Sequence, residues 1–134
     1  MFQVRVTVRG YELDSLGHLN QAVYLQYAEH ARWEILRAAG LEQATLLDSG
    51  VAPVVLETTI KYRRELRAGD EVDVSCEFRW GEGRTFGMHQ EIRRTDGTLA
   101  AELDGMLDLG ARKLLPDPVE AWRKVTPRPA VLGL

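Results

Sequence analysis

One long helical segment followed by several segments of strand periodicity constrains the fold of this chain most strongly. Between about Gln21 and Ala39, apolar side chains recur three and four residues apart, which predicts one face of an amphipathic helix. At the usual rise per residue such a helix is about 28 Å long. Its apolar face must be buried against another element. The sequence therefore predicts an α+β fold in which this helix covers one face of an antiparallel sheet.

Five segments alternate apolar and polar residues, which is the period of a half-buried strand. They cover residues 2–9, 54–63, 72–80, 86–92 and 99–109. The third has the most regular alternation and is predicted as one continuous strand. Thr95-Asp96-Gly97 carries the Asp-Gly signal of a hairpin between the last two. The sequence thus predicts five strands, four of them after the helix.

Residues typical of helix ends predict where the helices begin and end. Asn20 is expected as the N-cap of the long helix and Gly40 as the residue that follows its end. A second, short helix is predicted over 41–49. The tail over 116–134 contains four prolines, and we expect one short helix over 119–125 followed by a loose end.

Composition limits the classes of protein to which this chain can belong. Its 134 residues favour a single domain over 1–134, and its net charge of −3 disfavours nucleic-acid binding. The single cysteine excludes an intramolecular disulfide and a cysteine-rich zinc site, and three scattered histidines do not suggest a metal site. No apolar run reaches the roughly 20 residues of a membrane span, and no targeting signal is evident. We therefore expect a cytoplasmic protein without metal or membrane partner.

The loop before the long helix carries a motif that is specific for a known family. Tyr11-x-x-Asp14-x-x-Gly17-His18-Leu19-Asn20, followed by Tyr24-x-x-Tyr27-x-Glu29-x-Ala31-Arg32, resembles the hot-dog-fold thioesterases. The most similar group is the 4-hydroxybenzoyl-CoA thioesterase family with its acyl-CoA thioesterase relatives. The resemblance implies a long central helix wrapped by a five-stranded antiparallel sheet. It also implies an acyl-CoA substrate and no cofactor beyond the CoA of that substrate. Such proteins form homodimers, frequently paired into homotetramers, with active sites at the dimer interface.

The same resemblance implies roles for three residues of this loop and helix start. Asp14 takes the place of the catalytic carboxylate, which acts as nucleophile or as general base. The oxyanion donor, a backbone N–H, falls near Gln21. Many relatives have a histidine or asparagine at Gln21, and a glutamine cannot act as a base at neutral pH. His18 is a candidate base or substrate contact, or else it braces the helix start.

The resemblance also implies that Asp14 ranks above Glu12, the competing carboxylate, because the residue at the position of Glu12 varies in the family. Elementary chemistry independently supports a catalytic carboxylate before the helix. A helix N-terminus offers unpaired N–H groups and a partial positive charge, which stabilise an oxyanion. A carboxylate is also a credible nucleophile toward a thioester. The residue types leave open whether Asp14 acts as nucleophile or base.

Further residues are candidates for substrate binding. Arginine pairs well with phosphate, so the basic cluster around the end of the second strand is a candidate CoA site, although it can equally be a solvated strand edge. The substrate-binding candidates are Asn20, Tyr24, Glu29, Lys61, Arg63, Arg64, Arg84 and Thr85. As a binding residue, Glu29 would lie beside the pocket of a neighbouring subunit. Its other interpretations are an ion pair with Arg32 on the helix surface or a contact across a subunit interface. Tyr24, Tyr27 and Trp33 are expected in the core or an interface, and Met88, Met106 and Cys76 in the core.

Three functions remain compatible with these residues. The first is an acyl-CoA thioesterase, in which an acyl carrier protein could replace CoA as the handle. The second is an acyl-CoA hydratase or dehydratase that pairs Asp14 with His18. The third is a non-catalytic acyl-CoA binding module. The acyl group itself is not determined by the sequence.

Overall fold

The computed structural model describes residues 1–42, 44, 52–81, 83–110 and 118–134. Within these residues one long helix, a six-stranded sheet and a helical tail form the fold. In chain order the elements are β1 (Gln3–Thr7), η1 (Gly10–Glu12), α1 (Gln21–Ala38), β2 (Ala52–Tyr62), β3 (Glu71–Ser75), β4 (Glu77–Arg79), β5 (Thr85–Arg94), β6 (Leu99–Gly110), α3 (Pro118–Val125) and η2 (Pro129–Leu132).

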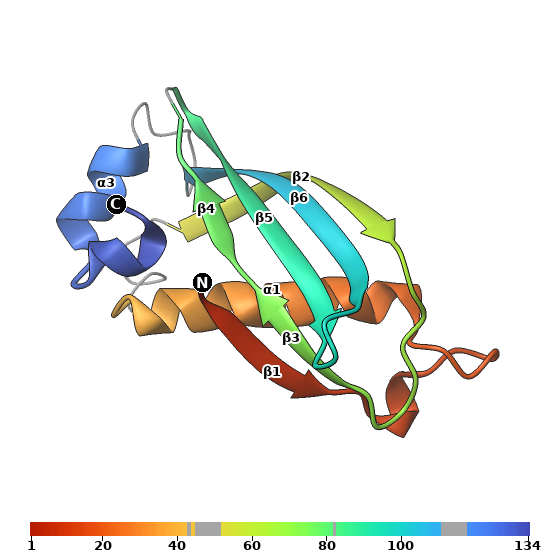
Figure 1. Cartoon of the computed structure of the whole chain (residues 1–134). Helices are drawn as coiled ribbons and strands as arrows, with labels where there is room; N and C mark the ends of the chain where they lie inside the picture. Colours follow the sequence, from red (N-terminus) through yellow and green to blue (C-terminus); the bar gives the residue numbers. More distant parts are fainter. Residues whose placement is uncertain (43, 45–51, 82, 111–117) are drawn as a thin grey trace.

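All strand pairs are antiparallel, and the strand order is β1-β3-β5-β6-β2, with β4 beside β5. The helix α1 lies across one face of this twisted sheet (Figure 1). The predicted α+β architecture is therefore confirmed. The strands β1 and β2 form the two edges, and the basic cluster at residues 61–64 begins at the end of β2.

The prediction of five strands is wrong because the strand expected over 72–80 is interrupted at Cys76. The Glu91 N–H of β5 donates to the Ser75 hydroxyl at 2.9 Å. The Cys76 N–H donates to the Phe2 carbonyl oxygen of the N-terminal segment at 3.2 Å. The register toward β5 is the same on both sides of the break, with Val74 opposite Ile92 and Glu77 opposite His89. Apolar alternation therefore continues through the break, and the sequence carries no sign of it.

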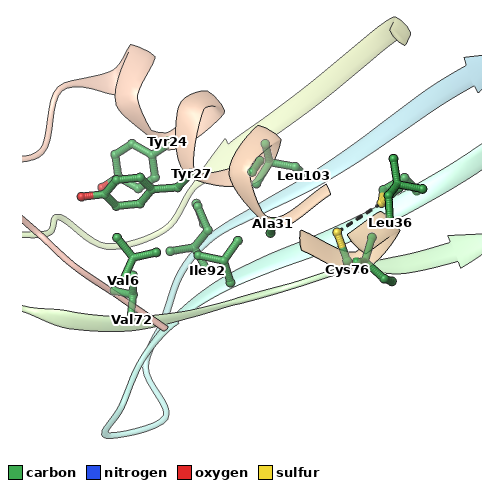
Figure 2. Close-up of a cluster of buried hydrophobic side chains, with 14 of the residues drawn as sticks. Val6, Tyr24, Tyr27, Ala31, Leu36, Val72, Cys76, Ile92 and Leu103 are labelled. Carbon is green, nitrogen blue, oxygen red and sulfur yellow. Dashed lines mark hydrogen bonds between the residues drawn. The ribbon is translucent and has the colours of Figure 1, made fainter. Parts of the chain in front are cut away.

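The core lies between α1 and the sheet, as Figure 2 shows for side chains of the helix and the strands. Ala28 and Ala31 are both 0% exposed, and such small residues let the helix approach the strands closely. The remaining buried residues of α1 are Tyr24, Tyr27, Ile35 and Leu36. Met88 is buried as predicted, but Met106 is 44% exposed. Met106 lies between the buried Leu107 and the half-buried Gly105 of β6, on the outer side of the sheet with Asp104.

Both ends of α1 follow the sequence prediction. The Asn20 side chain accepts a hydrogen bond from the Ala22 N–H at 2.9 Å, so Asn20 is the N-cap. Gly40 has a φ of +95°, a left-handed conformation that favours glycine after a helix end. The short helix predicted over 41–49 falls mostly on residues 43 and 45–49, which lie outside the described residues.

The C-terminal tail is packed, so the prediction of a loose end is wrong. A helix near 119–125 was expected, and α3 confirms it, with Trp122 1% exposed. After it, η2 buries Leu132, whose carbonyl oxygen accepts a hydrogen bond from the Trp80 Nε1–H at 2.7 Å. The Arg128 N–H donates to the Ala39 carbonyl oxygen at 2.9 Å, which joins the tail to the end of α1. Figure 1 shows α3 and the C-terminus at this end of the helix.

Candidate active site

The loop that carries Asp14 is closed by its own backbone. The Asp14 N–H donates to the His18 carbonyl oxygen at 2.7 Å, and Leu13 and Leu19 form an isolated antiparallel bridge. One carboxylate oxygen of Asp14, Oδ1, accepts from the Leu16 N–H at 2.9 Å and the His18 N–H at 3.1 Å. This is the local side-chain geometry that aspartate favours in tight turns. It holds the carboxyl group in one orientation and leaves Oδ2 without a hydrogen-bond donor among the described residues.

The N-terminus of α1 lies against the same cavity as Asp14. Asn20 satisfies the Ala22 N–H through its side chain and the Val23 N–H through its carbonyl oxygen, at 2.9 Å each. In the part of the chain that the structure describes, the Gln21 N–H has no acceptor. A backbone N–H that has no acceptor at a helix N-terminus can donate to an oxyanion and stabilise it.

A cavity of about 440 Å³ brings most of the predicted site residues together. It is lined by Asp14, His18, Leu19, Asn20, Gln21, Tyr24, Tyr62, Arg63, Arg64 and Glu65. The residues combine two carboxylates, an imidazole, a free backbone donor, two phenol rings and two guanidinium groups. Such a mixture can hold a polar ligand and carry out acid–base or nucleophilic chemistry.

Four predicted binding residues lie outside this cavity. Lys61 precedes the lining segment on β2 and is exposed. Arg84 is exposed beside the start of β5, and Thr85 pairs with Asp108 of β6. Glu29 lines a different cavity farther along α1. The structure therefore supports Arg63 and Arg64, rather than the whole basic set, as neighbours of Asp14.

Glu65 is a site residue that sequence reasoning missed. Its Oε2 lies 2.7 Å from His18 Nε2, and its Oε1 accepts from the Arg67 guanidinium at 2.7 Å. The hydrogen bond from Arg67, with the nearby His18 ring, lowers the pKa of Glu65. The His18 side chain is thus bonded to the segment after β2, as expected for a residue that braces the helix start. No local signal marks this pair, because the two residues are far apart in the sequence.

Two tyrosines, Tyr24 of α1 and Tyr62 of β2, join the helix start to the end of β2. The Tyr62 hydroxyl donates to the Gln21 carbonyl oxygen at 3.0 Å, and its ring packs edge-on against Tyr24 with centroids 5.1 Å apart. The Tyr24 hydroxyl donates to the Arg64 carbonyl oxygen at 3.4 Å. Burial raises the pKa of Tyr24, so this hydroxyl remains a donor. Tyr24 is both a core residue and a wall of the cavity.

Glu12, the competing carboxylate, is engaged elsewhere. Its Oε1 accepts from the Tyr27 hydroxyl at 2.6 Å and from the Arg9 N–H at 2.8 Å. The Arg9 guanidinium lies 3.5 Å from its Oε2. Burial, followed by the hydrogen bond to Glu12, raises the pKa of Tyr27. Glu12 therefore holds η1 against α1, and of the two competing carboxylates Asp14 is the one that lines the cavity.

The basic residues of the cavity differ in their partners. The Arg63 guanidinium donates to Glu102 of β6 at 3.1 Å. The Arg64 guanidinium donates to the Arg63 carbonyl oxygen at 3.3 Å, and no carboxylate among the described residues lies within 4.0 Å of it. Arg64 therefore retains free donors at the cavity, of the kind that bind phosphate.

The ion pair predicted between Glu29 and Arg32 does not form. Arg32 instead donates to the Gln90 side-chain oxygen at 3.2 Å, which is toward the sheet rather than along the helix surface. Both residues line a second cavity, together with the half-buried Trp33. Within the described ranges, no group of three metal-ligating side chains is found, and no helix is long and apolar enough to cross a membrane.

Comparison with known proteins identifies the family. The model of the thioesterase-like superfamily matches residues 8–123, which include the Asp14 loop, α1 and all of the sheet from β2 onward. This chain belongs to the thioesterase-like superfamily. The resemblance that the loop motif indicated is thereby confirmed.

Among the relatives of this thioesterase-like chain, the long-chain acyl-CoA thioesterase FadM of Escherichia coli is 32% identical over 94 residues, which cover 67% of each chain. A chloroplastic acyl-acyl carrier protein thioesterase of Arabidopsis thaliana is 41% identical over 74 residues, which cover 55% of this chain. The matched segments span 39% and 36% of the length of the two plant relatives. The crystal structure of a hypothetical protein from Aquifex aeolicus superposes with a TM-score of 0.84 at 25% identity, over 98% of this chain and 99% of that one.

Proposed function

We propose that this thioesterase-like chain hydrolyses an acyl-CoA thioester to the free acid and CoA, with Asp14 as nucleophile or general base. One observation carries the proposal. Two backbone N–H groups hold the Asp14 carboxylate, which lines the same cavity as Gln21, whose N–H has no acceptor among the described residues. The names of the relatives, among them acyl-CoA thioesterases, support the same activity.

In either role of Asp14, the reaction needs only the thioester, water and groups of this chain. As nucleophile, a carboxylate oxygen of Asp14 forms a bond to the thioester carbon, and the C–S bond breaks to release the CoA thiolate. Water then hydrolyses the resulting anhydride, which regenerates the carboxylate. As general base, Asp14 takes a proton from the water that attacks the thioester carbon. The C–S bond then breaks, and the proton passes from Asp14 to the departing CoA thiolate, which regenerates the carboxylate. In both routes the carbonyl oxygen becomes an oxyanion, for which the Gln21 N–H is the proposed donor.

The free guanidinium of Arg64 and the neighbouring Arg63 are proposed to bind phosphates of the handle, because arginine pairs with phosphate in a bidentate manner. CoA is the handle that we propose first. An acyl carrier protein remains the alternative handle, since one plant relative is named for that substrate. The hydratase alternative loses support, because the His18 ring is bonded to Glu65 rather than directed by Asp14.

We propose that the protein forms a homodimer through β2, and that two dimers associate as a homotetramer. The strand β2 is an edge of the sheet, and an unpaired edge is a template for another strand. Apolar side chains of this strand are between 43% and 50% exposed, namely Val54, Val55, Leu56 and Tyr62. Because Tyr62 also contacts the helix start, such a dimer would place the partner near the proposed site.

The test is a free-thiol release assay across a panel of acyl-CoA thioesters. Asp14→Asn keeps the shape of the side chain and removes its charge, and kcat is expected to fall about 10²-fold or more. Asp96→Asn, in the exposed hairpin between β5 and β6, is the matched control and should keep the wild-type kcat. Near-UV and far-UV circular dichroism verify that both variants are folded. A folded Asp14→Asn variant with wild-type kcat would exclude Asp14 as the catalytic group.

A further inference from the structure

Arg32 carries a positive charge into the space between α1 and the sheet. Its guanidinium donates to the Gln90 side-chain oxygen at 3.2 Å, and Gln90 is only 2% exposed. The amide nitrogen of Gln90 is occupied by the Ala28 carbonyl oxygen at 2.9 Å and the Cys76 sulfur at 3.1 Å. These bonds orient the Gln90 oxygen toward Arg32. The Gln90 side chain therefore fixes the position of the guanidinium without neutralising its charge.

The charge of Arg32 has no close counterion in the part of the chain that the structure describes. No carboxylate there lies within 4.0 Å of the guanidinium. Burial lowers the pKa of Arg32, and the negative charge of Glu29 offsets this only in part. A guanidinium has five N–H donors, and a buried charge is costly unless it is paired. The remaining donors are thus available to an anionic or strongly accepting ligand group.

These donors border a cavity of about 120 Å³ whose walls are mainly apolar. The cavity is lined by Glu29, Arg32, Trp33, Leu36, Pro53, Val55, Phe78, Met88 and Leu107. Among the described residues that line it, Arg32 is the one cation. Glu29 is exposed, so its carboxylate lies on the solvent side, while Arg32 is the more buried of the two. A small, mainly apolar cavity bordered by a half-buried guanidinium fits the end of a chain that terminates in a carboxylate.

The cavity at Arg32 and the cavity at Asp14 lie along the same side of α1. Gln21 and Arg32 are separated by three helical turns, about 16 Å, and so project in nearly the same direction. On the sheet side both cavities are bordered by β2, with Tyr62 at one and Val55 at the other.

The inner side of β2 between these two residues is open. Val55 and Tyr62 are paired with the buried Leu107 and Ala101, so they face α1, because directly opposite residues share one face of a sheet. Yet their exposed fractions are 43% and 47%. Ile60, between them, faces the same way and is only half-buried. The inner side of β2 between the two cavities therefore carries partly exposed side chains, which are apolar except for Thr58.

We propose that Arg32 selects acyl groups that carry a carboxylate at the end remote from the thioester. The inference rests on the proposed thioester hydrolysis and names the substrate class of that site. The thioester would lie at Asp14 and Gln21, the hydrocarbon chain along the inner side of β2, and the terminal carboxylate at the Arg32 guanidinium. An extended dodecanoyl chain is of the length that this span requires.

The experiment compares dodecanoyl-CoA with dodecanedioyl-CoA, which differ only in the terminal carboxylate. The readout is the ratio of kcat/KM for the two substrates, in the wild type and in Arg32→Met, which keeps the side-chain stem and removes the charge. The wild type should favour dodecanedioyl-CoA, and Arg32→Met should lower the ratio by about tenfold or more, as expected for hydrogen bonds between charged groups. Arg32→Lys, which keeps the charge, should retain part of the preference. Arg37→Met, an exposed arginine of the same helix paired with Glu34, is the control and should keep the wild-type ratio.

A second measurement separates this inference from the proposed activity. Binding of non-hydrolysable thioether analogues of the two acyl-CoAs is measured by calorimetry with the same variants. An Arg32-dependent preference in Kd without any hydrolysis would support the inference and overturn the proposed activity. Hydrolysis of both substrates with a ratio near one in the wild type would overturn the inference alone. In that case the exposed apolar side chains on the inner side of β2 would be a packing surface for a second copy of the chain. Because the wild-type ratio decides this outcome, the test does not depend on the stability of Arg32→Met.

Discussion

Asp14 and His18 are joined by two hydrogen bonds within one short loop. The Asp14 N–H donates to the His18 carbonyl oxygen at 2.7 Å, while the His18 N–H donates back to the Asp14 carboxylate at 3.1 Å. The imidazole of His18 in turn lies 2.7 Å from Glu65, beyond the end of β2. The proposed catalytic carboxylate is thus positioned by local backbone bonds, and the loop that contains it is attached to the sheet by a distant side chain.

The turn at Gly17 is expected to be necessary for this geometry. Gly17 has a φ of +79°, and a methyl group added there would meet no heavy atom within 4 Å. Gly17→Ala should therefore act only through backbone strain, and should lower the free energy of unfolding by about 1–2 kcal/mol. Because the loop carries Asp14, kcat should also fall, by about tenfold. Urea denaturation and the thiol-release assay measure the two effects. Gly10→Ala, which is equally open but has no positive φ, is the control, and equal effects in both variants would contradict the prediction.

The Tyr62 hydroxyl is expected to position the helix start. Tyr62→Phe keeps the edge-on ring contact with Tyr24 and removes the hydrogen bond to the Gln21 carbonyl oxygen. Stability should fall by no more than about 1 kcal/mol, because the bond is exposed to solvent. The peptide group of Gln21 would lose the hydrogen bond that holds it in position, so kcat should fall about threefold to tenfold. Tyr11→Phe removes a hydroxyl from a residue that is 85% exposed and should match the wild type in both assays. A wild-type kcat in Tyr62→Phe would show that activity does not depend on this hydrogen bond.

Stability should depend on pH through His89 on the outer side of the sheet. Burial disfavours the charged ring, but hydrogen bonds to Asp104 at 2.7 Å and Glu91 at 3.3 Å outweigh it, so the pKa of His89 is raised above its ordinary value of 6.5. A raised pKa means that the protonated ring stabilises the folded state. The contribution is complete below the ordinary pKa and is lost as the pH rises through the raised one.

The difference in Tm between the wild type and His89→Gln should therefore be larger at pH about 5.5 than at pH about 9. Thermal scans at both pH values measure it. His30→Gln, at an exposed position of α1, controls for the loss of a histidine elsewhere on the surface. An equal difference for His89→Gln at both pH values would show that its two carboxylate contacts contribute nothing to stability.

Cys76 should be unreactive in the folded protein. It is 3% exposed, and burial raises the pKa of its thiol to about 12. Because the thiolate is the reactive form, labelling by a disulfide reagent near neutral pH should be at least about a hundredfold slower in the native state than in urea. One thiol per chain should react after unfolding. Rapid labelling of the native protein would mean that the break between β3 and β4 opens readily.

Much of the fold was predictable because its signals are local. The spacing of apolar residues predicts α1, the alternation predicts most strands, and Asn20 and Gly40 mark the helix ends through bonds and dihedral angles of one turn. The orientation of Asp14 is also local, since its donors lie two and four residues away. The break at Cys76 was not predictable, because it depends on a Ser75 hydroxyl opposite β5.

The sequence by itself determined the helix, the strand periodicity, the family and the catalytic candidate, since each depends on residues within a few positions of one another. Tertiary structure alone decided which distant groups complete the site. Glu65 reaches His18, Tyr62 reaches Gln21 and Arg32 reaches Gln90 only after the sheet has acquired its register. The tail likewise becomes ordered only because Trp122 and Leu132 find apolar surface to bury. These contacts depend on burial and long-range register, which no pattern of neighbouring residues encodes.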